Sequence, residues 1–289
     1  MGKDTDTMDT KFTDLGLRAE LIEGIHRLGF ESPSPIQAET IPTALSGVDI
    51  VGLSQTGSGK TAAFGLPALN MIDVDLQQTQ VLVLCPTREL AVQVCEEINR
   101  LASARKGFTS VPVYGGAPID RQMRALRKGA HVVVGTPGRV MDHLRRKTLR
   151  TDAIGLCILD EADRMLDMGF IHDVKKILAL MPKKKQSLLF SATFSDEIRQ
   201  LASAFLHEPQ HIQVTPKNTT VQRITQGIYP VGRSRKKELL AHIIQENNWS
   251  QVLVFTRTKF GANSVAQFLS DKGISAMALH GNKSQAART

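Results

Sequence analysis

The sequence is poor in cysteine, and the spacing of its cysteines argues against the common uses of clustered thiols. The 289 residues include 3 cysteines, Cys85, Cys95 and Cys157, and no Cys-x-x-Cys pair. A zinc site or a disulfide framework is therefore not expected. Cys85 and Cys157 fall within apolar, strand-like runs and Cys95 falls on a predicted helix, so we expect buried and inert thiols.

Long hydrophobic runs are also missing. No apolar stretch approaches the roughly 20 residues that a membrane-spanning helix needs. The first residues, Met1 to Asp6, are polar and acidic, unlike a signal or transit peptide. The hydrophobic content of 42% and the charged content of 22% are ordinary for a globular protein. We therefore expect a cytoplasmic protein that does not associate with membranes.

The net charge of +8 is confined to one end of the chain. Residues 1–214 contain 25 Lys and Arg against 25 Asp and Glu, whereas residues 215–289 contain 11 against 3. A basic segment beside a neutral body favours attraction to a polyanion such as nucleic acid. A solvated basic surface without a partner is the alternative.

Short apolar runs alternate with amphipathic segments from residue 50 to residue 214. The runs are continuously apolar, which favours strands of a parallel sheet that is covered by helices on both faces. Ligands of such sheets bind at the carboxyl ends of the strands. The predicted strands are Ile50–Leu53, Val81–Cys85, Ser110–Tyr114, His131–Gly135, Leu156–Asp160, Ser187–Phe190 and Ile212–Val214.

Composition divides the chain into four segments. Residues 1–11 are polar without periodicity and are predicted to be disordered, and residues 12–214 form the α/β domain. Residues 215–222 are polar, contain a proline and are interpreted as a linker. The alternation resumes in residues 223–289, which we interpret as the first part of a second domain whose remainder is missing. Its predicted elements are the strands Ile224–Val231, Val252–Phe255 and Ala276–Leu279 and the helices Lys236–Glu246 and Phe260–Lys272.

Two motifs that follow predicted strands indicate a nucleotide site. The first is the glycine-containing run Ser54-Gln55-Thr56-Gly57-Ser58-Gly59-Lys60-Thr61. Its glycines let backbone N–H groups turn toward phosphates, Lys60 reaches the outer phosphates, and the Thr61 hydroxyl is a ligand for Mg²⁺. The second, Asp160-Glu161, ends an apolar run and offers one carboxylate to a metal and the next to a water. Together they predict binding and hydrolysis of a nucleoside triphosphate.

Further short motifs identify a family resemblance. In order along the chain they are Pro86-Thr87-Arg88-Glu89-Leu90, Gly115-Gly116, Thr136-Pro137-Gly138-Arg139, Asp160-Glu161-Ala162-Asp163 and Ser191-Ala192-Thr193. This order resembles that of the DEAD-box RNA helicases. The resemblance covers residues 12–289. The amino-acid sequences of residues 163–170 and 188–195 are similar to those of bacterial members.

The resemblance extends beyond these central motifs in both directions. Gly29-Phe30 with Pro33, Pro35-Ile36-Gln37 and an isolated Phe12 resemble the adenine-recognition motif of the family. Val252–Phe255 and Gln285–Arg288 resemble the first motifs of its second domain. The resemblance implies two RecA-like α/β domains that close on ATP, Mg²⁺ and RNA, and that open short duplexes locally.

The resemblance also implies roles for individual residues. Gln37 would bind the N6/N7 edge of adenine, as a side-chain amide can, and Phe30 would stack on the ring. Phe12 either contacts adenine or only supports Phe30, and both aromatics could instead be core residues. Lys60 and Thr61 would hold phosphate and Mg²⁺.

Catalytic and coupling roles are assigned in the same way. Asp160 would reach the metal, partly through water, and Glu161 would orient or deprotonate the attacking water. The residues implied to couple the acidic motif to strand separation are Asp163, Ser191, Ala192 and Thr193.

The implied RNA contacts involve the sugar–phosphate backbone and therefore predict low sequence selectivity. Contacts with 2′-hydroxyl groups would favour RNA over DNA. The residues concerned are Pro86, Thr87, Arg88, Gly115, Gly116, Thr136, Pro137, Gly138 and Arg139.

Two departures from the family pattern qualify this interpretation. Ser54 stands where the family usually has alanine, a small change that we expect to be tolerated. The last motifs of the family, which include its arginine finger, do not occur before Thr289. The chain is therefore expected to bind ATP but to hydrolyse it weakly. A DNA-directed helicase of the same superfamily and a non-catalytic RNA-binding fragment are the alternatives.

Overall fold

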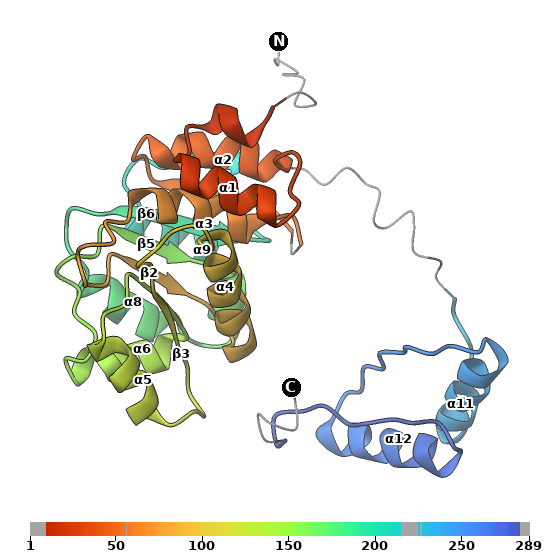
Figure 1. Ribbon diagram of the computed structural model, residues 1–289. Helices are drawn as coiled ribbons and strands as arrows, with labels where there is room; N and C mark the ends of the chain where they lie inside the picture. The colour runs from red at the N-terminus through yellow and green to blue at the C-terminus, as the bar shows by residue number, and fades with distance from the viewer. Residues whose placement is uncertain (1–9, 56, 215–224, 226, 284–289) are drawn as a thin grey trace. The chain divides into compact units, whose positions relative to one another are not determined.

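The computed structural model describes residues 10–55, 57–214, 225 and 227–283 (Figure 1). The chain divides into two compact units, Met1–Lys217 and Asn218–Thr289. The predicted linker 215–222, nearly all of the predicted N-terminal segment 1–11, Thr56 and the Gln285–Arg288 motif lie outside the described residues.

The larger unit contains a sheet of seven parallel strands, in the order β3-β4-β2-β5-β6-β1-β7. Register is set by pairs such as Val51 with Leu189 and Leu82 with Cys157. This arrangement confirms the predicted parallel α/β fold. The strands are β1 Ile50–Leu53, β2 Val81–Leu84, β3 Ser110–Val113, β4 Val132–Gly135, β5 Leu156–Leu159, β6 Gln186–Ser191 and β7 Gln210–Gln213.

Helices cover both faces of this sheet, and each face has its own hydrophobic core. One core joins strand residues such as Ile158 to α1–α4, and the other joins residues such as Leu159 to α5–α9. Successive strand residues point to opposite faces, so a strand buried on both sides must be continuously apolar. The helices are α1 Ala19–Arg27, α2 Pro35–Leu45, α3 Lys60–Met71, α4 Arg88–Leu101, α5 Ile119–Arg127, α6 Pro137–Arg145, α7 Ala162–Asp167, α8 Ile171–Ala179 and α9 Asp196–Phe205, and a short 3₁₀ helix, η1, spans Phe12–Leu15.

The three cysteines are buried and free, as their positions in apolar runs predicted. Burial raises the pKa of the Cys157 thiol to about 12 and raises that of Cys85 well above its ordinary value. These thiols stay protonated at neutral pH and are therefore poor nucleophiles. Within the described residues, no helix is both long and apolar enough to cross a bilayer.

The smaller unit differs from its prediction. Two α-helices form where they were expected, α11 Lys236–Glu246 and α12 Lys259–Asp271, after a short 3₁₀ helix η2 at Arg233–Arg235. The segments Val252–Phe255 and Ala276–Leu279, predicted as strands, carry no strand assignment, and neither do the described residues of 224–231.

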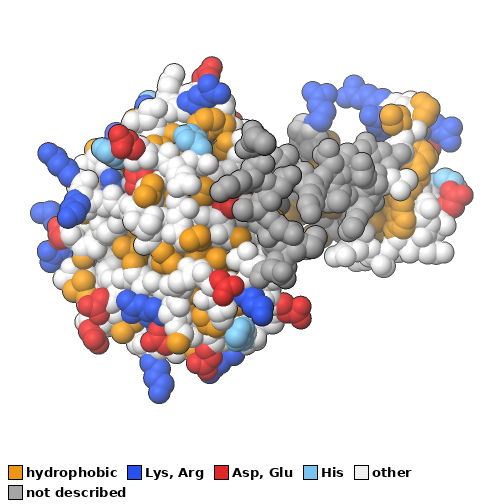
Figure 2. Space-filling model, turned by 90° about the horizontal axis from the view of Figure 1, so that it is seen from above, with side chains coloured by type: hydrophobic (Ala, Val, Ile, Leu, Met, Phe, Trp, Pro, Cys, Tyr) orange, Lys and Arg blue, Asp and Glu red, His pale blue; other side chains and the backbone are white. Residues whose placement is uncertain are grey.

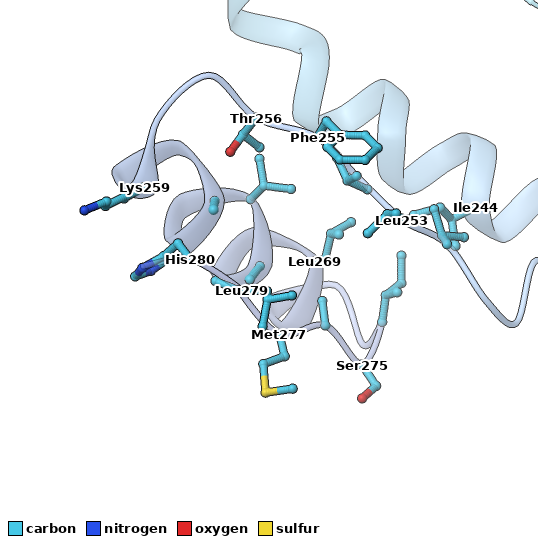
Figure 3. A pocket seen from close by; sticks show the side chains of 18 of the residues that line it. Ile244, Leu253, Phe255, Thr256, Lys259, Leu269, Ser275, Met277, Leu279 and His280 are labelled. Atoms are coloured by element: carbon cyan, nitrogen blue, oxygen red, sulfur yellow. The ribbon is translucent and has the colours of Figure 1, made fainter. Parts of the chain in front are cut away.

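The physical reason lies in the different needs of helices and strands. A helix satisfies its own backbone hydrogen bonds, whereas a strand needs a paired neighbour. Leu253 and Phe255 are 76% and 89% exposed, and among the described residues of this unit the buried hydrophobic side chains are those of Ala241, Ile244, Leu269 and Ala278. A cavity of about 540 Å³ lies among the two helices and the two extended segments (Figure 3).

Charge is distributed differently in the two units. Lys, Arg, Asp and Glu side chains are spread over the larger unit, whereas Lys and Arg predominate among the charged side chains visible on the smaller one (Figure 2). Residues 215–289 contain 11 basic and 3 acidic residues, so this view agrees with the composition.

Candidate functional site

The motifs of the larger unit gather at one edge of the sheet, the carboxyl ends of the strands. Ser54 follows β1, Asp160 follows β5 and Ser191 ends β6, and these three strands are neighbours in the order β5-β6-β1. A hydrogen bond of 3.1 Å from Ser54 N to Ser191 O joins two of these ends. The strand order therefore brings the glycine-containing loop and the acidic pair to the same half of this edge.

The glycine-containing loop folds back on itself. Lys60, 7% exposed, donates from Nζ to the Ser54 carbonyl oxygen at 3.1 Å. Gly57 and Gly59 have φ values of 82° and 91°, which a side chain would strain. The Ser54 hydroxyl accepts a 3.1 Å hydrogen bond from the hydroxyl of Ser58. Serine at this position therefore fits the loop.

Asp160 lies in a low-dielectric environment beside this loop. It is 3% exposed, and its Oδ1 has no hydrogen-bond partner among the described residues. The pKa of this carboxyl is raised to about 6, chiefly by burial, with the charge of Lys60 acting to lower it and that of Glu161 to raise it. A buried, unpartnered carboxylate oxygen is costly unless a cation binds it. A carboxylate oxygen is a donor of the kind that Mg²⁺ prefers.

Glu161 occupies the turn between β5 and α7. Its φ of 51° places a non-glycine residue in the left-handed region, where the backbone is strained. It stands at the N-cap position of α7, and its side chain is partly exposed. Such strain is commonly retained where a side chain must be aimed at a ligand.

One acidic residue of this site escaped the sequence analysis. Glu97 of α4 is partly buried, and burial raises its pKa, while a hydrogen bond with the Thr61 hydroxyl lowers it. The charge of Glu97 also raises the pKa of Asp160. The signal was present in the helical periodicity, because Glu97 is three residues after Val94 and four before Leu101, both core residues.

The predicted adenine-binding residues lie next to the loop. Gln37 is 5% exposed; its Nε2 donates to Gly59 O at 3.1 Å, and its Oε1 accepts from Ser34 N at 2.9 Å. The Ser34 hydroxyl donates to Ser58 O at 2.9 Å. Gln37 thus holds the loop, while its amide keeps one further N–H and one further lone pair for a ligand.

The two aromatic residues of this region differ in exposure. Phe30 is 41% exposed, whereas Phe12 is 3% exposed and belongs to the core. Their ring centroids are 6.5 Å apart at an interplanar angle of 53°. An exposed ring supported by a buried one is suited to stacking, so the geometry favours Phe30 as the contact and Phe12 as its support.

The predicted RNA-binding residues occupy the other half of the same edge. They follow β2, β3 and β4, which are neighbours in the sheet. Arg88 lies against Gly115-Gly116, and a Cβ atom on Gly116 would overlap with its guanidinium. Thr87 caps α4 by accepting a 3.2 Å hydrogen bond from Leu90 N.

The Thr136–Arg139 segment follows β4, the strand that lies between β3 and β2 in the sheet. Thr136 N donates to Val113 O at 3.0 Å, and Pro137 and Gly138 form the first turn of α6. The Arg139 side chain is 13% exposed, and its Nη1 donates to Ala117 O at 3.0 Å. Pro86, which follows β2, is buried.

The predicted coupling residues are joined directly. Asp163 Oδ2 accepts hydrogen bonds from Ala192 N at 3.2 Å, Thr193 N at 3.0 Å and Thr193 Oγ1 at 3.1 Å. Its Oδ1 accepts from Arg164 N at 3.0 Å. The Ser191 hydroxyl is buried without a partner among the described residues. The acidic motif is thus tied to the segment that follows β6.

The amino-acid sequence is similar to those of known helicases. The sequence model of the DEAD/DEAH box helicase family matches residues 34–201. The chain is 46% identical over 279 residues to the DEAD-box ATP-dependent RNA helicase CshA of Bacillus cereus (strain ATCC 10987 / NRS 248), covering 96% of this chain and 53% of that protein. It is 46% identical over 280 residues to the ATP-dependent RNA helicase DeaD of Escherichia coli (strain K12), covering 97% and 44%.

A solved structure is similar as well. The crystal structure of a DEAD box protein from the hyperthermophile Methanococcus jannaschii matches with a TM-score of 0.69 and 39% sequence identity, over 96% of this chain and 75% of that one. The chain spans about half the length of the curated relatives it matches.

Proposed function

Because the chain belongs to the DEAD/DEAH box helicase family, we propose that it is an ATP-dependent RNA helicase that binds the RNA backbone and opens short duplexes locally. The observation that carries this proposal is the division of one sheet edge. Its β5-β6-β1 half bears Lys60 and Asp160, and its β3-β4-β2 half bears Arg88 and Gly116.

In this proposal, Lys60 and the backbone N–H groups of residues 57–61 bind the phosphates of ATP. Lys60 would exchange its hydrogen bond to Ser54 O for the outer phosphates. Thr61 and Asp160 would hold Mg²⁺, which when bound neutralises charge on the phosphate oxygens. Glu161 accepts a proton from, or orients, the water that attacks the outer phosphorus atom.

Adenine recognition is proposed for Gln37 and Phe30. The free N–H and lone pair of the Gln37 amide match the N6/N7 edge of adenine. Because Gln37 also holds Gly59 and neighbours Ser34, base recognition would stabilise the phosphate loop at the same time. The partial exposure of Phe30 supports a stacking role for its ring.

Removing the Phe30 ring is expected to weaken the binding of ATP more than the binding of a ligand that lacks a base. A Phe30→Ala variant should bind ATP about fivefold less tightly or weaker still, since an aromatic contact contributes on the order of 1 kcal/mol beyond burial. Calorimetric titrations of both proteins with ATP and with inorganic triphosphate check this expectation. The triphosphate should bind both proteins equally, and an equal loss for both ligands would contradict adenine stacking.

RNA binding is proposed for the residues at the ends of β2, β3 and β4, with the backbone as the ligand. Arg88 and the hydroxyls of Thr87 and Thr136 donate to phosphate, and glycines let backbone amides come close. The members of this set are Pro86, Thr87, Arg88, Gly115, Gly116, Thr136, Pro137, Gly138 and Arg139.

The domain organisation forms part of the proposal. Residues 12–214 would be the ATP-binding RecA-like domain, residues 215–222 the linker, and residues 223–289 part of the second RecA-like domain. The basic composition of residues 215–289 supports a polyanionic ligand for the second unit. We also propose a cytoplasmic location, as the composition predicted.

A nucleic-acid comparison tests the function. We propose that the chain hydrolyses ATP only weakly; that weak hydrolysis is expected to rise with single-stranded RNA and to respond much less to DNA of matched sequence, because 2′-hydroxyl contacts favour RNA. Equal stimulation by both would favour the DNA-directed alternative. Binding of RNA without stimulated hydrolysis would favour a non-catalytic RNA-binding role for this chain.

A further inference from the structure

The neighbouring helices α5 and α6 (Figure 1) are joined by a buried polar network that also contacts the residues on either side of Gly115-Gly116. Gln122 of α5 is 7% exposed, and His143 of α6 is fully buried. Gln122 Nε2 donates to the Tyr114 carbonyl oxygen at 3.0 Å, and His143 Nε2 lies 3.1 Å from Gln122 Oε1. The network therefore holds the residue just before the two glycines.

Arg139 completes the network on the other side of the turn. Its Nη1 donates to Gln122 Oε1 at 3.2 Å and to the Ala117 carbonyl oxygen at 3.0 Å. The carbonyl groups of Tyr114 and Ala117 thus accept hydrogen bonds from Gln122 and Arg139, respectively. These two side chains are also hydrogen-bonded to each other. Gly116 has a φ of 82°. Because glycine adopts positive and negative φ values about equally readily, the turn needs such contacts to stay in this one conformation.

The donor and acceptor pattern permits one arrangement of these groups. Gln122 Oε1 faces the Arg139 guanidinium, which only donates, and its Nε2 faces a carbonyl oxygen, which only accepts, so reversing the amide would oppose like groups in both contacts. Since Oε1 only accepts, His143 Nε2 must carry the hydrogen, and its Nδ1 faces the Thr148 hydroxyl at 2.8 Å. Burial and the nearby charge of Arg139 lower the pKa of His143, in agreement with a neutral ring.

We propose that Gln122, oriented by His143, is a positioning residue that fixes the Gly115-Gly116 turn in the conformation in which its backbone N–H groups and Arg88 receive an RNA phosphate. This inference rests on the RNA-binding function proposed above. Gln122 does not touch the ligand; it removes the conformational freedom that the turn would otherwise lose on binding. The sequence pattern gave no sign of this role, because a lone glutamine in an amphipathic helix is unremarkable.

The main test compares two buried glutamines of equal exposure. Gln122→Leu removes the network, whereas Gln80→Leu removes an unrelated set of hydrogen bonds at the start of β2, to Asp73 and Leu76. Both residues are 7% exposed, so both variants are expected to melt at a lower temperature. Circular dichroism fixes a temperature at which each is folded.

RNA affinity then separates positioning from stability. Anisotropy of a 5′-labelled single-stranded oligouridylate, with a non-hydrolysable ATP analogue present, should give a Kd about tenfold higher for Gln122→Leu, the loss expected when one buried hydrogen-bonding group is removed. Gln80→Leu should bind as the unmodified chain does, and both should bind the ATP analogue normally. Unchanged RNA affinity of folded Gln122→Leu would overturn the proposal.

Backbone order parameters test the turn without RNA. Those of residues 115–117, measured by NMR relaxation, should be lower in Gln122→Leu than in the unmodified chain or in Gln80→Leu, while those of α4 stay the same. Unchanged order parameters at the turn would overturn the inference. Lower values in a chain that binds no RNA in unmodified form would overturn the proposed RNA function and leave the fixing of the turn standing.

A second substitution divides the network. Gln122→Glu keeps acceptors for Arg139 and His143 but has no donor for Tyr114 O while it is ionised. Weakened RNA binding with lower order parameters at residues 115–117 is expected, because Tyr114 O loses its hydrogen bond. Binding and order parameters equal to those of the unmodified chain would show that the Tyr114 contact does not position the turn.

Discussion

Glu161→Gln is expected to lower RNA-stimulated ATP hydrolysis by about a hundredfold or more while ATP remains bound, because an amide cannot accept the proton of the attacking water. The strained φ of 51° at Glu161 and its place at the end of β5 aim this side chain from the same edge that holds Asp160. The measurement is steady-state hydrolysis at saturating RNA, beside equilibrium binding of a fluorescent ATP analogue.

The control for this variant is Glu39→Gln, the same change at an exposed position of α2. It should leave hydrolysis unchanged. Mg²⁺ must be saturating in all assays, because the charge of Glu161 also raises the pKa of Asp160, and its removal alters the proposed metal site. Hydrolysis within a few-fold of the unmodified chain would remove Glu161 from the proposed mechanism.

Asp163→Ala is expected to abolish most of the stimulation of hydrolysis by RNA. The variant loses all three hydrogen bonds from Ala192 and Thr193 to one carboxylate oxygen. Hydrogen bonds to a charged acceptor contribute about 1.5–3 kcal/mol each before any relaxation. The acidic motif would then move independently of the segment after β6. Hydrolysis measured over a range of RNA concentrations should show stimulation reduced more than about tenfold, consistent with losing at least one such bond.

Asp167→Ala is the matched control, because Asp167 lies in the same short helix and is exposed. It should retain full stimulation. Binding of ATP and of RNA, each measured alone, should change little in Asp163→Ala if the residue only couples the two halves of the site. Intact stimulation in a variant that is folded would contradict the coupling role.

The local motifs of the larger unit were predictable from sequence because their chemistry is short-range. The glycines of the loop need positive φ, and Gly57 and Gly59 have it. The predicted strands formed because continuously apolar runs such as Leu156–Leu159 can be buried only between two helical layers. The family resemblance supplied the expected roles, and those of individual residues stay predictions.

The strands expected at Val252–Phe255 and Ala276–Leu279 were predicted by the same reasoning, and these described segments carry no strand assignment. Val252–Phe255 has the apolar composition of a strand, yet it lies extended and exposed. Composition reports that a segment can pair, whereas pairing depends on a neighbour that composition does not describe. The helices α11 and α12 needed no such neighbour and formed where they were expected.

The sequence by itself determined the elements of the larger unit and the groups that begin at their ends, because helix periodicity, apolar runs and glycine conformation act over a few residues. Only the tertiary structure decided the strand order β3-β4-β2-β5-β6-β1-β7, which divides one edge into a nucleotide half and an RNA half. It also decided the partners of Glu97, Gln122 and His143, whose contacts lie far away in the sequence. Such contacts depend on how helices pack against a sheet, and no local pattern encodes that packing.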